Sequence, residues 1–109
     1  MPKNMYIYKT LYLLGITPTY RCFLYTAYIV NYLVENKSKG PLNLAKLARD
    51  LDTTPKRLER NLHFAAVTAW EENSHLLTQL AKKPLSAAPS APEFLYLLAA
   101  HFIRQQKAS

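Results

Sequence analysis

The chain has 109 residues, a length that suits one domain built around a single hydrophobic core. Half of the residues are hydrophobic and only 19% are charged, which excludes a disordered tail. Fourteen Lys and Arg against seven Asp and Glu give a net charge of +7, which favours polyanionic partners. The single cysteine, Cys22, excludes an internal disulfide framework and zinc sites built from several cysteines.

No segment predicts a membrane span or a secretion signal. The longest uncharged run, 22–34, has 13 residues and contains Thr26 and Asn31, whereas a spanning helix needs about 20 mostly apolar residues. The apolar stretch after Lys3 and Lys9 is short and lacks a small-residue cleavage site. We therefore expect a cytoplasmic protein that forms one domain over residues 1–109 and has no membrane partner.

The spacing of apolar residues predicts an all-α fold of about six helices without strands. The first helix runs from about 4 to 14 and stops at Gly15, which fits a helix end. The second begins near Thr17-Pro18, with Thr17 as the cap, and continues to about 35. Its aromatic and β-branched residues would allow a strand, but a length of about 18 residues favours a helix. A polar linker follows at 36–41.

The second half of the chain predicts four further helices. The third covers about 42–51, and the fourth covers about 54–71, with Thr53 or Thr54 as its cap. Ser74 is expected to cap a short fifth helix that ends at 81, and residues 82–91 are expected to form a loop. Ser90 and Glu93 form a capping box for the last helix, about 92–106.

Residues 42–71 predict a helix-turn-helix whose second helix is the recognition helix. Four apolar residues gather on one side of that helix at about 100° per residue: Leu58, Leu62, Ala65 and Ala69. Arg60 and Lys56 point away from this side, and Arg57 and Glu59 lie on its two flanks. Arg can donate two hydrogen bonds to guanine, and Glu can accept one from cytosine. The sequence thus predicts base contacts by Arg57, Glu59 and Arg60 in the major groove.

The charge distribution agrees with a nucleic-acid site in this region. Residues 37–60 carry seven Lys or Arg and three Asp or Glu, so the positive excess is concentrated there. Lys56 is then a candidate phosphate contact. The alternative is a solvated basic face, because many all-α domains contain a basic helix after a turn without binding nucleic acid.

No pattern predicts an enzyme. The chain has no Gly-rich phosphate loop and no recognisable Ser/His/Asp constellation, so we expect no small-molecule substrate and no cofactor. Its three histidines, His63, His75 and His101, lack metal-ligand spacing, so no metal site is predicted. Cys22 is interpreted as a buried structural thiol and Trp70 as a core residue.

The helix-turn-helix resembles the C-terminal effector domain of the stage-zero A family, the master sporulation response regulators of endospore-forming bacteria. The Thr-Thr-Pro-Lys-Arg-Leu-Glu-Arg-Asn-Leu run at 53–62, followed by Ala-Trp at 69–70, carries the resemblance. It extends over roughly residues 10–109. Weaker similarity lies at 14–18, 47–48, 93–94 and 107–109.

The resemblance implies a six-helix transcription regulator that binds promoter boxes on double-stranded DNA, as a homodimer or as tandem copies. It implies that Arg57, Glu59 and Arg60 read bases, because they match family positions that do so. It also implies a phosphate contact by Lys82 or Lys83, in the loop before the last helix. The family's receiver domain is missing from these 109 residues, which fits either an excised domain or a short stand-alone relative. Met1 and the differing N-terminus favour the stand-alone relative.

Some residues depart from the family pattern. His63 and Phe64 stand where the family has Arg and His, and Glu71-Glu72 replace a neutral-to-basic turn. Both changes lower affinity for a polyanion. They favour an alternative function, an interaction module that pairs with a full-length regulator through its last helix, 94–104. The retained Arg57, Glu59 and Arg60 favour DNA binding, because an interaction module does not need them.

Overall fold

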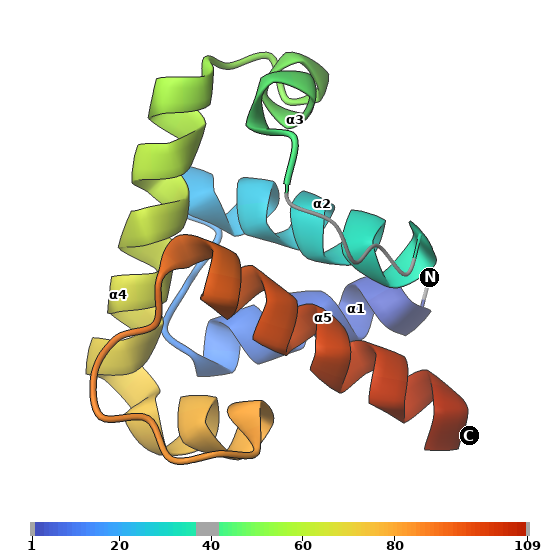
Figure 1. Cartoon of the computed structure of the whole chain (residues 1–109), viewed down its shortest axis with the longest axis vertical. Helices are drawn as coiled ribbons and strands as arrows, with labels where there is room; N and C mark the ends of the chain where they lie inside the picture. The colour runs from blue at the N-terminus through green and yellow to red at the C-terminus, as the bar shows by residue number, and fades with distance from the viewer. Residues whose placement is uncertain (1, 37–41, 109) are drawn as a thin grey trace.

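Five α-helices and no strand are present in the computed structural model, which describes residues 2–36 and 42–108 (Figure 1). The all-α prediction is confirmed. Most of the expected linker, 37–41, lies outside the described residues. The helices are α1 (Pro2–Leu13), α2 (Arg21–Asn36), α3 (Leu44–Asp50), α4 (Pro55–Ala81) and α5 (Ala91–Ala108).

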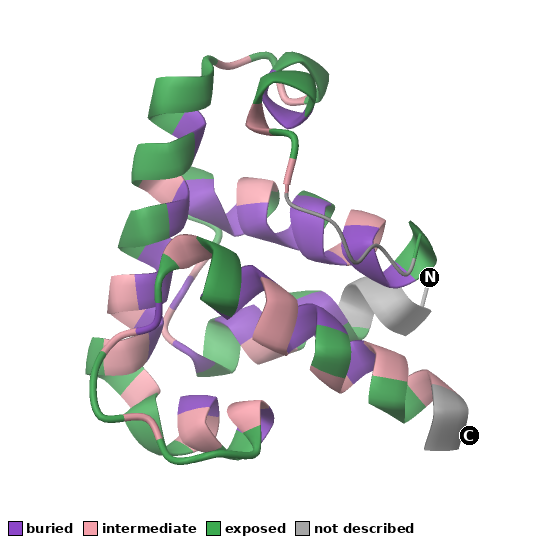
Figure 2. Cartoon of the chain, viewed as in Figure 1, coloured by how far each residue is buried: buried purple, intermediate pink, exposed green. Residues whose placement is uncertain are grey.

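Helix α2 is the central element of the fold. It packs against α1, α4 and α5, while α4 also contacts α5, and α3 packs on α4. The apolar sides of these helices meet in one hydrophobic core. Figure 2 shows that the first turns of α4 are buried on the side facing α2 and exposed on the outer side. The outer side of α4 is thus exposed to solvent, while its inner side packs on α2.

The end of α1 follows the predicted glycine stop. Gly15 has a φ of 87°, a left-handed conformation that glycine adopts at little cost. The amide of Ile16 donates to the carbonyl of Leu11 at 2.9 Å, and that of Gly15 donates to Tyr12 at 2.9 Å. These two bonds satisfy the carbonyls of Leu11 and Tyr12 near the end of α1, and the Ile16 side chain is buried in the core.

The start of α2 differs from the prediction. The helix begins at Arg21, not near Thr17-Pro18, because residues 17–20 form a separate turn in which the amide of Tyr20 donates to the carbonyl of Thr17 at 3.0 Å. The Thr17 hydroxyl is 2.7 Å from the Thr19 hydroxyl. The carbonyl and the hydroxyl of Thr17 are thus both hydrogen-bonded within the turn, and Thr17 does not cap the helix.

The two helices predicted at 54–71 and 74–81 are joined in α4, which bends at Asn73. Asn73 has non-helical backbone angles, φ −157° and ψ 65°. Its Oδ1 accepts a hydrogen bond from the amide of Leu76 at 3.1 Å, so Asn73 caps the second part of α4 and the predicted cap at Ser74 is wrong. An Asn side chain reaches the free amides beyond a bend as a serine would.

Other predicted caps are confirmed. The Thr54 hydroxyl accepts from the amide of Arg57 at 3.2 Å, and Pro55 occupies the first turn. Ser90 and Glu93 exchange two hydrogen bonds of 3.2 Å, which start α5. Helix α3 begins later than predicted, because Asn43 caps it through the amide of Lys46.

Candidate nucleic-acid interface

Helices α3 and α4 are joined by a tight turn, with α3 lying across the beginning of α4 (Figure 1). Asp52 in the turn has a φ of 56°, and the amide of Thr53 donates to the carbonyl of Ala48 at 2.9 Å. Ala48 is fully buried, and its small side chain allows α3 and α4 to approach closely. The apolar row predicted on α4 is buried as well: Leu58, Leu62, Ala65 and Ala69. In the described residues, α3 and α4 thus pack together on either side of a tight turn.

A polar network fixes α3 to α2. Asp50 Oδ2 accepts a hydrogen bond from Tyr28 Oη at 3.2 Å and pairs with Lys46 Nζ at 3.0 Å. Lys46 also lies over the Tyr32 ring, 5.1 Å from its centroid. The hydrogen bond from Lys46 lowers the pKa of the Asp50 carboxyl below its ordinary value, and Asp50 raises the pKa of Lys46. These contacts link α3 to α2 at the surface, while its buried residues Leu47 and Ala48 belong to the core.

The candidate DNA-contacting residues on α4 are all exposed. Lys56, Arg57, Glu59 and Arg60 occupy its first two turns. None of them forms an ion pair, since Lys46–Asp50 is the one salt bridge within the described part of the chain. Their charged groups are therefore available to a ligand.

The three cations stand where the helix itself disfavours them. The amino end of a helix carries a partial positive charge, which favours acidic residues, yet the first turn of α4 contains none. Lys56 and Arg60 are also four residues apart, where like charges repel by about 0.2–0.5 kcal/mol. Glu59, three residues after Lys56, offsets part of this repulsion, and the Thr54 cap and Pro55 stabilise the same turn.

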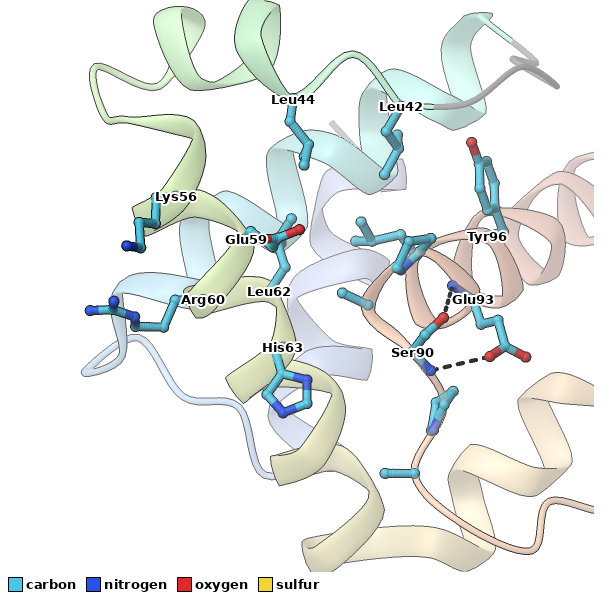
Figure 3. A pocket seen from close by; sticks show the side chains of 15 residues that line it. Leu42, Leu44, Lys56, Glu59, Arg60, Leu62, His63, Ser90, Glu93 and Tyr96 are labelled. Carbon is cyan, nitrogen blue, oxygen red and sulfur yellow. Dashed lines mark hydrogen bonds between the residues drawn. The ribbon is translucent and has the colours of Figure 1, made fainter.

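The predicted base-reading residues do not share one direction. In Figure 3 the side chains of Lys56 and Arg60 point away from a neighbouring groove, whereas the Glu59 carboxylate points into it. The groove has a volume of about 1060 Å³ and is mainly apolar; residues within 42–44, 56–63 and 88–96 line it. Arg57 does not line the groove. Arg57 and Glu59 thus lie on opposite flanks of α4, as the helical spacing predicted.

The two lysines proposed as phosphate contacts lie elsewhere. Lys82 ends α4 in a left-handed conformation, φ 57°, and Lys83 follows it. They occupy the opposite end of α4 from Lys56, beyond the bend at Asn73 (Figure 1). The structure therefore brings Lys56, Arg57, Glu59 and Arg60 together at one end of the helix and leaves Lys82 and Lys83 apart from them.

His63, Phe64, Glu71 and Glu72 are all exposed. His63 lines the groove, and Glu71 lies on the surface. Glu72 packs against Gly15 at the end of α1, where a Cβ on the glycine would meet the Glu72 Cβ at 2.6 Å. Glu72 therefore has a packing role that its charge did not indicate. Trp70 is half-buried at the edge of the core instead of within it.

Several groups outside α4 complete the chemical inventory. Burial raises the pKa of the Cys22 thiol to about 11, which suits an inert structural cysteine. Burial also lowers the pKa of His101. Within the described residues, no three His, Cys, Asp or Glu side chains come together as a metal site.

Two features of this surface were missed by the sequence reasoning. One is the groove, and the other is an edge-to-face contact between Tyr20 and Phe64, with ring centroids 5.2 Å apart. Both join segments that are distant in the chain, so no local spacing could have indicated them.

Comparisons with known proteins add no relative. No family model matches this chain, and no curated protein and no solved structure shows significant similarity to it. Across the described ranges, no helix combines the length and the hydrophobicity that crossing a membrane requires.

Proposed function

We propose that this chain is a sequence-specific regulator of transcription that inserts the first turns of α4 into the major groove of double-stranded DNA. The observation that carries the proposal is the set of three exposed cations without ion pairs, Lys56, Arg57 and Arg60, at the beginning of the second helix of a helix-turn-helix. The N-terminal residues of such a helix are the ones that reach base edges.

Each side chain has a distinct part in this function. Arg57 and Arg60 donate paired hydrogen bonds to guanine, and Lys56 neutralises a phosphate. Glu59 accepts from a cytosine amino group, for which its carboxylate turns out of the groove that it faces in the structure. The resemblance to the sporulation effector domain supports the same assignment, with promoter boxes as the target and a homodimer or tandem copies as the bound form.

The test is fluorescence anisotropy with a duplex that carries a sporulation-type promoter box and with a scrambled duplex, each at two salt concentrations. We expect tighter binding to the box, and a loss of about 1–3 kcal/mol for Arg60→Ala on the box alone. Lys9→Ala is the matched control, because Lys9 is an exposed cation on α1. The proposal would be contradicted if the chain bound both duplexes equally weakly and Arg60→Ala did not change this binding.

The alternative, an interaction module that uses the last helix, receives less support. Most apolar side chains of α5 are committed to the core, among them Phe94, Leu98 and Phe102. The large exposed hydrophobic residues of the described chain lie on α1, α2, α4 and the turn before α2. If the DNA test fails, capture of a full-length regulator by this chain becomes the next measurement.

A further inference from the structure

The Tyr20–Phe64 contact joins the start of α2 to the exposed side of α4. Tyr20 lies immediately before α2, Phe64 lies on α4, and the two rings pack edge to face with centroids 5.2 Å apart. Figure 1 shows the beginning of α2 beside α4. Tyr20 is 40% exposed and Phe64 is 46% exposed, so this pair is a surface feature.

The pair lies on the same side of α4 as Arg57. Phe64 follows Arg57 by seven residues, which is about two turns and about 10 Å along the helix axis. The major groove of DNA is about 12 Å wide. With the first turn of α4 at base edges, a third turn about 10 Å farther along the axis would reach the sugar-phosphate strand that borders a groove of this width. Tyr20, which contacts Phe64, and the adjacent Arg21 would then lie beside that strand.

The chemistry of Tyr20 and Arg21 suits a phosphodiester. A guanidinium binds phosphate oxygens with paired hydrogen bonds, and a phenol hydroxyl donates one more. Arg21 is exposed and makes no ion pair with any residue that the structure describes. Residues 1–34 contain no Asp or Glu that would repel a phosphate. Arg21 is therefore an exposed cation in a segment without acidic residues, while on α4 the exposed Glu71 follows Phe64 by seven residues and lies on the same side of that helix.

We propose that Tyr20 and Arg21 bind the phosphodiester backbone of the DNA strand that borders the groove read by α4. Phe64 is a positioning residue, since it holds the Tyr20 ring and touches no DNA itself. This inference rests on the proposed function and extends it. It also gives Phe64, which departs from the family pattern, a role outside the core.

The test compares Arg21→Gln with Lys9→Gln, because each removes one exposed positive charge. For Arg21→Gln we expect equal losses of affinity on the box and scrambled duplexes and a log–log salt slope that is shallower by about 0.9. A salt increase from about 50 to about 200 mM then weakens the wild type about 3.5-fold more than this variant. Lys9→Gln retains the wild-type slope.

Two further variants test the tyrosine and its support. Tyr20→Phe keeps the ring contact and is expected to weaken both duplexes about two- to tenfold by loss of one hydrogen bond. Phe64→Ala flattens the salt slope as Arg21→Gln does, and Phe64→Tyr restores it, an effect that a merely structural role would not produce. Circular dichroism melting confirms that each variant is folded.

The outcomes separate this inference from the proposed function. If Arg60→Ala removes the preference for the box while Arg21→Gln matches the wild type in slope and affinity, the backbone contact alone is overturned. A loss confined to the box would overturn it too, since phosphate contacts carry no sequence information. If the wild-type chain shows no salt-dependent binding to either duplex, the proposed function fails and the contact fails with it.

Discussion

The side-chain amide of Asn73 donates a hydrogen bond of 3.0 Å to the backbone carbonyl of Leu13, which ties the bend of α4 to the last turn of α1. The same side chain accepts from the amide of Leu76. One residue thus caps the second part of α4 and satisfies a free carbonyl at the end of another helix. This junction links the bend of α4 to the end of α1.

Replacing Asn73 tests the junction. Asn73→Ala is expected to reduce the free energy of unfolding by about 1–2 kcal/mol, because both the cap and the bond to Leu13 are lost. Asn73→Asp retains the acceptor for the Leu76 amide and loses the donor to the Leu13 carbonyl. The stability of this variant should therefore fall between those of the wild type and Asn73→Ala. Urea denaturation measures all three proteins. An Asn73→Ala variant as stable as the wild type would show that the bend does not need this side chain.

Gly15 is expected to be intolerant of any side chain. Gly15→Ala is predicted to destabilise the fold by about 1–3 kcal/mol, since alanine is strained at positive φ. The added Cβ would also lie 2.6 Å from the Cβ of Glu72. Thermal unfolding followed by circular dichroism gives the measurement. Glu72→Ala, which keeps the glycine, is the control and should change the stability much less.

Stability and DNA binding are expected to oppose one another at Lys56. Lys56→Glu places an acidic residue in the first turn of α4 and gives Arg60 an opposite charge four residues away. The helix dipole favours the new carboxylate by about 0.3–1 kcal/mol, and its attraction to Arg60 is offset by its repulsion from Glu59, three residues on, so the free energy of unfolding should rise by about 0.3–1 kcal/mol at most. Affinity for DNA should fall on every sequence, because a phosphate contact is replaced by a repulsion. A variant that binds duplexes like the wild type would argue against an interface at this end of α4.

The Asp50 network should make stability depend on acid pH. The hydrogen bond from Lys46 lowers the pKa of Asp50 in the folded chain below the ordinary value of 3.8. The contribution of Asp50 is therefore fully present above about pH 3.8 and is lost as the pH falls through the lower folded pKa. Asp50→Asn should weaken the loss of stability in this window, measured by urea titrations at several pH values. An unchanged pH profile would show that the network contributes nothing to the docking of α3.

The hydroxyl of Thr26 has no hydrogen-bond partner in the described part of the chain, although the residue is fully buried in α2. Thr26→Val removes that unsatisfied group at nearly the same volume, so we expect equal or greater stability. Thr26→Ser keeps the hydroxyl, loses a methyl group and should be less stable than either protein. Chemical denaturation of the three proteins ranks them, and a large loss for Thr26→Val would point to a partner for the hydroxyl.

The sequence alone determined the features that depend on neighbouring residues. The cap at Thr54, the capping box of Ser90 and Glu93 and the glycine stop at Gly15 are all found in the structure. Each of these features needs only a few consecutive residues and one backbone amide or turn, so a local pattern suffices to predict it. The helical spacing of the buried side of α4 followed for the same reason.

Tertiary structure decided what depends on contacts between distant segments. At three positions the sequence allows more than one local structure, and packing selects one of them. These are the start of α2 at Arg21, the cap at Asn73 and the half-buried position of Trp70. The groove that Glu59 faces depends on how the helices are placed relative to one another. A helical pattern gives the direction in which a side chain points around the axis of its own helix. It contains no information on which other helix lies opposite, and that placement is set by the shared core.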